Sequence, residues 1–380
     1  MKYHKPMFTR SIQSVIENRL HQKKAIILIG ARQVGKSTLF DNIVKQIQLP
    51  TLTLNCDEPE TRQILTDINS KELALLIGKN KVVVIDEAQR VDNIGMTLKL
   101  ITDNFPDIQL LATGSSSFEL RNRLNEPLTG RKYEYTLYPM STEELMHDKG
   151  LLYVKQTLDS RLLYGSYPDV LNNPDNAKEI LMNLASSYLY KDILEHEGIR
   201  RPELINKLLI ALALQVGSEV SYNELAKTIG TDNKTIERYI DMLEKCFVIF
   251  RLSAFSRNLR TELRKSKKIY FYDNGIRNAI IQNFAPLAMR QDVGALWENF
   301  FISERIKHNH YNGSYAQSYF WRTTRQQEVD YIEIENGEIS AFEMKWNPNK
   351  KGTPLPKTFE ETYSPKQSIV VTPENFYEWV

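Results

Sequence analysis

Short apolar or β-branched runs alternate with helix-compatible stretches over residues 1–148 of the chain. The runs predict strands at residues 25–29, 51–55, 81–86, 109–113 and 132–137. The run that ends at Asp86 is almost continuously apolar, as in parallel strands that are buried on both faces. A helix-compatible stretch at residues 36–46 separates the first two runs. Strands that alternate with helices predict an α/β fold, with a parallel sheet and helices on both faces.

The pattern becomes mostly helical over residues 150–200, and an apolar-periodic helix follows at residues 204–216. A capping box at residues 221–224 predicts the start of a short helix. A second helix begins at Thr231, and a strand spans residues 247–252. Helix, turn, helix and strand in this order predict a winged helix-turn-helix region.

The last part of the chain predicts a helix followed by three short strands, an α+β arrangement. The helix covers residues 293–305 and is expected to be amphipathic. The strands are predicted at residues 319–322, 328–334 and 339–345. Asn336 and Gly337 separate the last two strands, and an Asn-Gly pair is a strong signal for a two-residue hairpin turn.

Composition describes an ordinary soluble globular protein of 380 residues, with 42% hydrophobic and 25% charged residues. This length suggests two or three domains. The net charge of +2 is too balanced to indicate a nucleic-acid partner. Cys56 and Cys246 lie far apart and are expected to be buried, reduced thiols of a cytoplasmic protein. We expect no signal peptide, because the amino terminus lacks a long apolar core, and no membrane span, because no window approaches 18 consecutive apolar residues.

Residues 30–37 read G-A-R-Q-V-G-K-S, which is the complete G-x-x-x-x-G-K-[ST] phosphate loop (Walker A) between a predicted strand and a predicted helix. Its backbone N–H groups and the positive end of the following helix favour phosphate binding. Lys36 can reach the β- and γ-phosphates, and Ser37 can hold Mg²⁺. The predicted nucleotide-binding residues are Gly30, Ala31, Arg32, Gln33, Val34, Gly35, Lys36, Ser37 and Thr38.

A second motif (Walker B) ends the strand at residues 81–86, where Asp86 is followed by Glu87. At the carboxyl end of a parallel strand, Asp86 is expected beside the phosphate loop as a Mg²⁺ ligand, direct or through water. Glu87 is predicted to polarise a water for attack on the γ-phosphate. The alternative is a strand that ends in two solvated acids. With the phosphate loop, the pair predicts hydrolysis in addition to nucleotide binding.

The order of strand, phosphate loop, second strand, Asp-Glu strand and polar residue resembles that of the AAA+ ATPases. The resemblance implies ATP and Mg²⁺ as cofactors and Ser115 as a catalytic sensor, with Thr113 as the second choice; a plain Gly-Ser turn at residues 114–116 is the alternative. It also implies that Arg131 is an arginine finger or sensor arginine, often supplied by a neighbouring subunit. Arg121 and Arg123 are rivals for this role, and an ordinary surface arginine is the alternative.

Charge around the predicted winged helix is uneven. The second helix, residues 231–245, carries three basic and four acidic residues, which disfavours a polyanion partner. Residues 251–268 carry seven basic residues and one acidic residue, and these could contact phosphates of DNA or RNA. A packing or protein-interaction module with a solvated basic edge stays open as the alternative.

A third group of polar residues lies on the last helix and strands. Asp330 and Glu343 fall on strands that the hairpin joins, and Lys345 shares a face with Glu343. Two carboxylates and a lysine can bind Mg²⁺ and activate water. The order resembles the PD-(D/E)xK nuclease core, with Glu298 as the helix acid. The alternatives are salt bridges on a hairpin and a nuclease-like fold used only for binding.

Taken whole, the chain resembles a prokaryotic family of AAA+ ATPases whose carboxyl-terminal domain of unknown function joins a winged helix to a nuclease-like fold. This predicts an ATPase domain at residues 1–148, a helical and winged-helix region at 149–268, and a nuclease-like domain at 269–380. The resemblance implies Mg²⁺-dependent ATP hydrolysis and a homo-oligomer such as a hexameric ring, and it leaves the substrate open. The basic stretch at residues 251–268, together with Asp330, Glu343 and Lys345, predicts DNA or RNA as a partner. The rival hypothesis is a nucleotide-switched protein-interaction module with an inactive nuclease-like domain.

Overall fold

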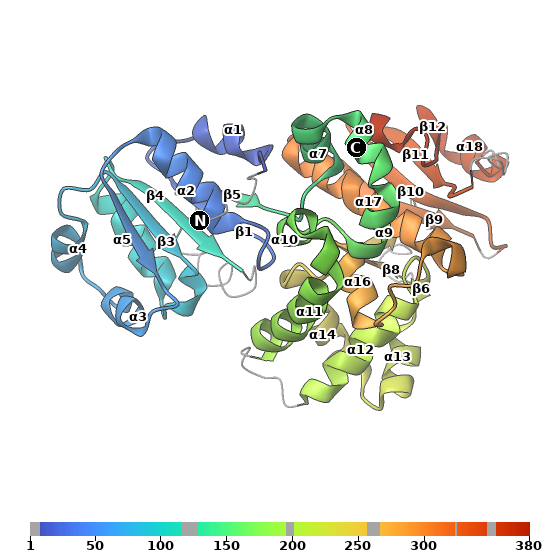
Figure 1. The fold of residues 1–380 in the computed structure, drawn as a ribbon, viewed down its shortest axis with the longest axis horizontal. Coiled ribbons are helices and arrows are strands. Elements are labelled where there is room, and N and C mark those ends of the chain that lie inside the picture. The colour runs from blue at the N-terminus through green and yellow to red at the C-terminus, as the bar shows by residue number, and fades with distance from the viewer. Residues whose placement is uncertain (1–7, 116–127, 195–200, 257–266, 324, 348–354) are drawn as a thin grey trace. The chain divides into compact units, whose positions relative to one another are not determined.

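The computed structural model describes residues 8–115, 128–194, 201–256, 267–323, 325–347 and 355–380 (Figure 1). The chain divides into two compact units, which we describe one at a time. The smaller unit comprises residues 9–138 and 245–247, and residues 139–244 and 248–380 make up most of the larger unit.

The smaller unit is built on a five-stranded parallel sheet in the order β2-β3-β4-β1-β5. The strands are β1 (Ala25–Ile29), β2 (Thr51–Asn55), β3 (Val82–Asp86), β4 (Gln109–Gly114) and β5 (Lys132–Thr136). The helices are α1 (Ile12–Glu17), α2 (Lys36–Ile47), α3 (Pro59–Leu65), α4 (Ser70–Ile77) and α5 (Ile94–Asn104), with a 3-10 turn η1 (Ala88–Arg90) after β3. The predicted α/β fold with a parallel sheet is confirmed.

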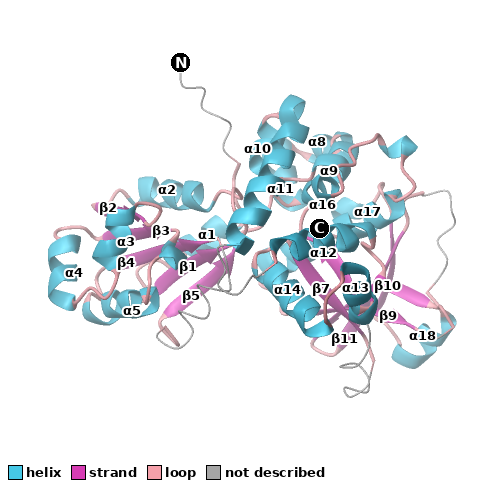
Figure 2. Ribbon diagram, turned by 90° about the horizontal axis from the view of Figure 1, so that it is seen from below, coloured by secondary structure: helices cyan, strands magenta, loops and turns pink. Residues whose placement is uncertain are grey.

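Burial follows the position of each strand in the sheet. All residues of the central strands β1 and β4 are buried, whereas the edge strands β2 and β5 are mostly half-buried. In Figure 2, α2 lies on one face of the sheet and α5 on the other. Because α2 follows β1 and α5 follows β3, the two helices belong to crossovers that run in opposite directions along the sheet.

The larger unit begins with short helices and continues into a seven-stranded mixed sheet. The helices that precede the first strand of this sheet are α7 (Thr142–Lys149), α8 (Leu151–Gln156), α9 (Leu158–Tyr164), α10 (Pro168–Asn172), α11 (Ala177–Leu194) and α12 (Pro202–Leu214). The helices that lie between its strands in the sequence are α13 (Tyr222–Ile229), α14 (Asn233–Lys245), α16 (Asn274–Ile280), α17 (Val293–Tyr311) and α18 (Lys357–Tyr363). Ser221 caps α13 by accepting a hydrogen bond from the Glu224 amide at 3.3 Å, which is one of the two bonds of the predicted capping box.

The sheet of the larger unit has the order β12-β11-β10-β9-β7-β8-β6. Its strands are β6 (Glu219–Val220), β7 (Ile249–Ala254), β8 (Lys267–Phe271), β9 (Gln317–Arg322), β10 (Glu328–Glu335), β11 (Glu338–Met344) and β12 (Gln367–Val371). Strands β7 and β9 pair in parallel, so the strands of the predicted second and third domains belong to one sheet. The predicted domain boundary between residues 268 and 269 therefore divides this sheet, and it stays a prediction from the sequence.

The hairpin between β10 and β11 has the predicted two-residue turn. Glu335 pairs with Glu338, and the two residues between them, Asn336 and Gly337, have φ values of 52° and 83°. Positive φ at both central positions is what this type of turn requires. Strand β12 then adds to β11 in parallel, so the sheet continues beyond Lys345.

Helix α17 differs from the prediction of an amphipathic helix. Trp297 and Phe301 are fully buried, but polar residues on other faces are buried too, including Asn299 and Ser303. The helix contacts β8 and β11 of the sheet and also α9 and α16. Because neighbours surround it, its polar residues are buried with partners of their own.

Two expectations from composition can be compared with the structure. Cys56 and Cys246 are both buried and free of disulfides, as predicted. Across the part of the chain that the structure describes, we find no helix that is long and apolar enough to cross a membrane.

Candidate functional site

The phosphate loop, residues 30–37, joins β1 to α2 as predicted. Gly30 has φ 152°, and a Cβ atom there would lie 2.1 Å from the carbonyl oxygen of Leu137. Gly35 has φ 99° and directly precedes α2. Both glycines are therefore required by the local geometry, and the loop leads into the amino terminus of a 12-residue helix, a favourable place for phosphate.

The side chains of Lys36 and Ser37 take different positions around the loop. Lys36 is 5% exposed, and its Nζ donates hydrogen bonds to the carbonyl oxygens of Gly30 at 2.9 Å and Ala31 at 2.8 Å. The exposed hydroxyl of Ser37 donates to Asp86 Oδ2 at 2.8 Å. A hydroxyl and a carboxylate are hard oxygen ligands of the kind that suits Mg²⁺, so this pair fits the cation of a nucleotide complex.

The other residues of the predicted loop divide into buried and accessible positions. Ala31 and Val34 are almost fully buried and point into the unit. Arg32 is half-buried, whereas the side chains of Gln33 and Thr38 are exposed. The buried pair fixes the loop to the unit, and the remaining positions are accessible from solvent.

Thr113 links the two acids at the end of β3. Its hydroxyl donates a short hydrogen bond to Asp86 Oδ1 and accepts one from the Glu87 amide at 3.0 Å. Thr113 is fully buried, because it belongs to the central strand β4. The sequence ranked Ser115 ahead of Thr113, but the structure brings both hydroxyls to the Asp86-Glu87 pair.

Ser115 and Gln89 both contact the carboxylate of Glu87. Glu87 Oε2 accepts hydrogen bonds from Gln89 Nε2 at 2.6 Å and from Ser115 Oγ at 3.1 Å. Gln89 Nε2 also donates to Ser115 Oγ at 2.9 Å. Gln89 and Ser115 are 5% and 1% exposed, so Glu87 is held by two buried donors. The sequence analysis did not predict Gln89 as a site residue. The only signal for it in the sequence is its place two residues after Glu87.

Arg10 is a second residue that sequence reasoning missed. It is 6% exposed, and its guanidinium donates at 2.6 Å to the carbonyl oxygens of both Val34 and Tyr138. One side chain therefore fixes the phosphate loop to the segment that follows β5. No local motif marks Arg10, because its partners lie 24 and 128 residues away in the sequence.

Arg131 lies away from the phosphate loop of its own chain. Its carbonyl accepts from the Ala25 amide at the start of β1, while the loop follows the end of that strand. Five strand residues separate the two ends, or about 16 Å. Arg131 Nε forms an exposed ion pair with Asp103 Oδ1 at 2.5 Å. The rival arginines, Arg121 and Arg123, lie outside the described residues.

Cys56 lies near the two acids, and its surroundings change the pKa of its thiol. Burial, reinforced by the charges of Asp86 and Glu87, raises the pKa of the Cys56 thiol to about 12. A thiol of this kind stays protonated near neutral pH and is a poor nucleophile and metal ligand. Cys56 is thus a packing residue beside the two acids.

In the larger unit, Glu298 has partners that the sequence did not suggest. Its Oε1 accepts from Lys268 Nζ at 3.0 Å and from the Tyr270 hydroxyl at 2.6 Å. Lys268 is 1% exposed and also pairs with Glu328 at 2.5 Å. Burial alone would lower the pKa of Lys268, but the charges of Glu298 and Glu328 raise it above its usual value. The helix acid is therefore part of a buried ion-pair network.

Asp330, Glu343 and Lys345 lie together on the β10–β11 hairpin, as predicted. The register that pairs Tyr331 with Phe342 places Asp330 opposite Glu343. Lys345 Nζ donates to Glu343 Oε1 at 2.6 Å, and Asp330 Oδ2 accepts from the backbone amide of Met344 at 2.9 Å.

Burial and neighbouring charge both act on the ionisable groups of this hairpin cluster. Burial, with the charges of Glu298 and Glu343, raises the pKa of Asp330 well above its usual value. Burial alone would lower the pKa of Lys345, but its hydrogen bond to Glu343 raises it. The other oxygen of Glu343, Oε2, is buried without a hydrogen-bond partner. Within the described ranges, no group of three or more His, Cys, Asp or Glu residues is arranged to hold a metal ion.

Three family models match successive parts of the chain. Residues 22–146 match an AAA domain, residues 155–287 match a domain of unknown function (DUF8612), and residues 293–379 match another domain of unknown function (DUF4143). The matched ranges end and begin at other positions than the predicted domain boundaries.

Relatives in other organisms align with most of this chain. An uncharacterized protein of Mycobacterium tuberculosis is 26% identical over 343 residues, covering 88% of this chain and 73% of the relative. An uncharacterized protein of Methanocaldococcus jannaschii, MJ1544, is 25% identical over 346 residues, covering 85% and 75%. An uncharacterized protein of Haemophilus influenzae is 27% identical over 275 residues, covering 67% and 68%.

Among solved structures, a Walker-type ATPase of Pyrococcus abyssi is 17% identical and covers 72% of this chain and 96% of its own, with a TM-score of 0.49. This is a distant likeness. The match of residues 22–146 to an AAA domain agrees with the phosphate loop that lies beside Asp86 in the structure. The smaller unit is accordingly a P-loop ATPase domain of the AAA type.

Proposed function

We propose that the chain is a Mg²⁺-dependent ATPase whose larger unit engages nucleic acid. The observation that carries the ATPase part is the 2.8 Å hydrogen bond between Ser37 Oγ and Asp86 Oδ2. It joins a side chain of the phosphate loop to a carboxylate of the adjacent buried strand, which is the pair of oxygen groups that P-loop enzymes use for Mg²⁺. When bound, the ion would neutralise charge on the phosphates.

The side chains of the site then have separate tasks. Residues 30–38 bind the phosphates through backbone N–H groups and the Lys36 ammonium, which a phosphate would draw from the carbonyls of Gly30 and Ala31. Glu87 acts as the general base that orients water, and Ser115 and Thr113 hold the acids in place. Arg131 acts on the nucleotide of a neighbouring subunit in a homo-oligomer, since its own loop lies at the opposite end of the strands.

Two substitutions test the ATPase. Lys36→Ala should abolish nucleotide binding, because it removes the buried ammonium of the loop. Glu87→Gln should retain ATP binding and lose turnover by about 10²–10⁴-fold, the usual contribution of a general base. Binding is measured with a fluorescent ATP analogue and turnover by phosphate release. If Glu87→Gln hydrolyses ATP at the parent rate, the assignment of the base is wrong.

The proposal for the larger unit rests on the order and pairing of its elements. Helices α13 and α14 follow one another, and β8 pairs antiparallel with both β6 and β7, an arrangement that supports a winged helix. Two of the seven basic residues at 251–268 are already paired: Arg251 with Asp241 and Glu244, and Lys268 within the sheet. The candidates for phosphate contacts are then Lys267 and four residues outside the described ranges: Arg257, Arg260, Arg264 and Lys265.

Cleavage of nucleic acid is not part of this proposal. The helix, hairpin and parallel strand around Asp330 and Glu343 support a nuclease-like module at residues 269–380, after a helical and winged-helix module at 149–268 and the ATPase at 1–148. However, Glu298 and Glu343 already pair with Lys268 and Lys345, an arrangement that does not fit a divalent metal. The pairing favours a nuclease-like fold that binds without cutting.

A further inference from the structure

Residues 137–142, which we call the connector, leave the phosphate-loop sheet and enter the larger unit. All six residues are buried. Pro139 fixes its own φ and disfavours helical geometry at Tyr138. Each end of the connector makes specific contacts within the unit to which it belongs.

The amino-terminal end of the connector is fixed to the phosphate loop. The Leu137 amide donates at 2.7 Å to the carbonyl of Ile29, the last residue before the loop, and the Leu137 carbonyl packs where Gly30 lacks a side chain. Arg10 adds a second link, because it binds both Tyr138 and Val34 through their carbonyl oxygens. A shift of the loop backbone would therefore displace Leu137 and Tyr138.

The other end of the connector is fixed inside the larger unit. The Met140 amide donates to the Ser166 carbonyl at 2.9 Å, and the Met140 carbonyl accepts from Lys307 Nζ at 3.4 Å. The Thr142 amide donates to Glu304 Oε2. Glu304 and Lys307 lie on α17, are 1% and 2% exposed, and pair with each other at 2.6 Å.

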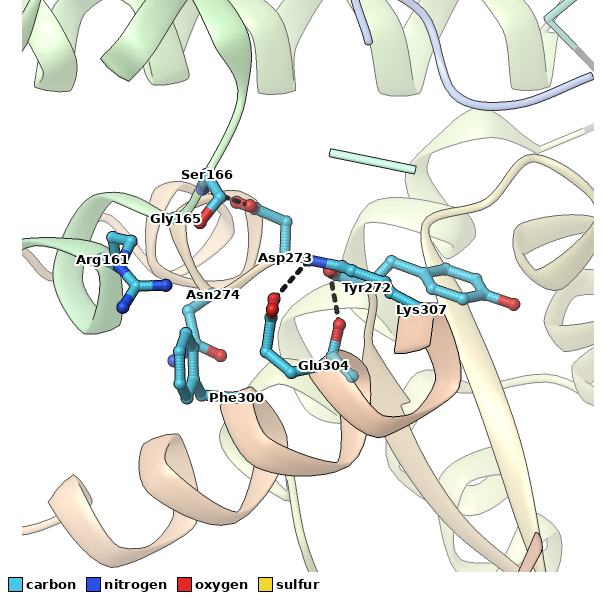
Figure 3. A pocket seen from close by; sticks show the side chains of 10 residues that line it. Arg161, Gly165, Ser166, Tyr272, Asp273, Asn274, Phe300, Glu304 and Lys307 are labelled. Atoms are coloured by element: carbon cyan, nitrogen blue, oxygen red, sulfur yellow. Dashed lines mark hydrogen bonds and ion pairs between the residues drawn. The ribbon is translucent and has the colours of Figure 1, made fainter. Parts of the chain in front are cut away.

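These contacts belong to a buried polar cluster around a cavity of about 10 Å³, enough for about one water molecule (Figure 3). Asp273, which follows β8, accepts from the Ser166 amide at 2.7 Å and lies where a Cβ on Gly165 would clash at 1.9 Å. Burial raises the pKa of Asp273. Three sequence segments to which the ATPase assigns no role therefore meet here: residues 137–141, 162–169 and 269–273.

Lys36 relates phosphate binding to the residue against which the connector packs. The Lys36 ammonium donates to the carbonyls of Gly30 and Ala31, and a bound phosphate would compete for the same ammonium. Gly30 is the residue against which Leu137 packs. We propose that the connector transmits the nucleotide state of the phosphate loop to the polar cluster of Asp273, Glu304 and Lys307. This inference rests on the proposed ATPase and adds how its nucleotide state is transmitted.

The test is amide hydrogen exchange of the Glu87→Gln protein with and without saturating Mg²⁺–ATP. ATP should change the exchange of the Met140, Thr142 and Ser166 amides about fivefold or more, the lower end of usual coupling between sites. In an Arg10→Met background this change should fall below twofold at saturating ATP. Arg19→Met is the matched control, because Arg19 is an exposed arginine of the same unit that stacks on Tyr133, and it should leave the change intact.

Arg10→Lys gives a second measurement if Arg10→Met does not fold. Lysine keeps the charge, but it has no planar fork to bridge two carbonyl groups, so the response should fall in this variant also. ATP binding without changed exchange in the connector, or a full response in the Arg10 variant that folds, would overturn the inference and leave the ATPase intact. Failure of the Glu87→Gln protein to bind ATP would instead contradict the proposed function.

Discussion

The backbone of Glu87 lies in the left-handed region, with φ 52° and ψ 42°. This conformation costs a residue other than glycine roughly 1–2 kcal/mol, and such strain persists where the surroundings enforce it. Here the Thr113 hydroxyl holds the amide of Glu87, and Gln89 and Ser115 hold its carboxylate. The backbone strain of Glu87 and the two buried donors to its carboxylate together indicate that the orientation of this side chain matters for catalysis.

Gln89→Leu tests whether this orientation contributes to turnover. A hydrogen bond to a charged group is worth about 1.5–3 kcal/mol, so its loss should lower kcat by about 10–100-fold. The KM for ATP should stay near the parent value, because Gln89 contacts Glu87 and Ser115 and not the phosphate loop. Steady-state kinetics at several pH values measure both constants.

A double variant separates a shared positioning role from two independent effects. Ser115→Ala should lower kcat as Gln89→Leu does, and the double variant should lose less than the sum of the two free-energy changes, since both donors share one oxygen of Glu87. Fully additive losses would contradict the positioning role.

At the scale of elements, the strands of the smaller unit were predictable almost to the residue. Each combines an apolar or β-branched run with a flanking motif, as β1 does before the phosphate loop and β3 does before Glu87. The Asn336-Gly337 turn also fixed the register of its hairpin. Local sequence carries enough information in these cases because the strand period and the turn geometry are local properties.

Elements whose environment depends on distant segments were less predictable. The sequence of α17 indicates a helix with one apolar face, but α9 and α16 pack on it from outside the sheet and bury Glu304 and Lys307 as well. The buried bonds of Arg10 likewise depend on Tyr138, which is 128 residues away. No periodicity encodes such contacts, so the candidate site was predicted in its motifs but not in the residues that support them.

The basic segment at residues 251–268 leads to an element-scale prediction about nucleic acid. The protein with ATP should retain DNA or RNA at low salt, and log K should fall with log salt by about 0.9 per phosphate contact. Replacing Arg257, Arg260 and Arg264 together by Ala should reduce that slope by about 3. Gel-shift titrations at several salt concentrations measure the slope.

The matched control replaces exposed lysines of the smaller unit, Lys71 and Lys79, by Ala. This variant should keep the parent slope. No retention at low salt by the ATP-bound parent protein would refute nucleic-acid binding and favour the nucleotide-switched protein-interaction module. Equal slopes for the triple variant and the parent would remove residues 257–264 from the interface.

At the scale of the whole molecule, the position of Arg131 makes oligomerisation a test of mechanism. Arg131 precedes β5, at the opposite end of the strands from its own phosphate loop, so a catalytic role for Arg131 requires the nucleotide of another subunit. Arg131→Ala should lower turnover by about 10³-fold, as for arginine fingers. Light scattering should show that the Glu87→Gln protein with ATP is larger than a monomer.

Mixing two inactive variants distinguishes a finger from a structural arginine. Arg131→Ala keeps an intact phosphate loop, and Lys36→Ala keeps an intact Arg131, so a subunit of each can complete one site at their contact. A 1:1 mixture should recover up to about a quarter of the parent rate if subunits assort randomly in a cyclic assembly. Asp103→Asn, which removes the ion pair at 2.5 Å and keeps Arg131, should stay active. A mixture as inactive as its components, or a monomer at every concentration with ATP, would reduce Arg131 to the partner of Asp103.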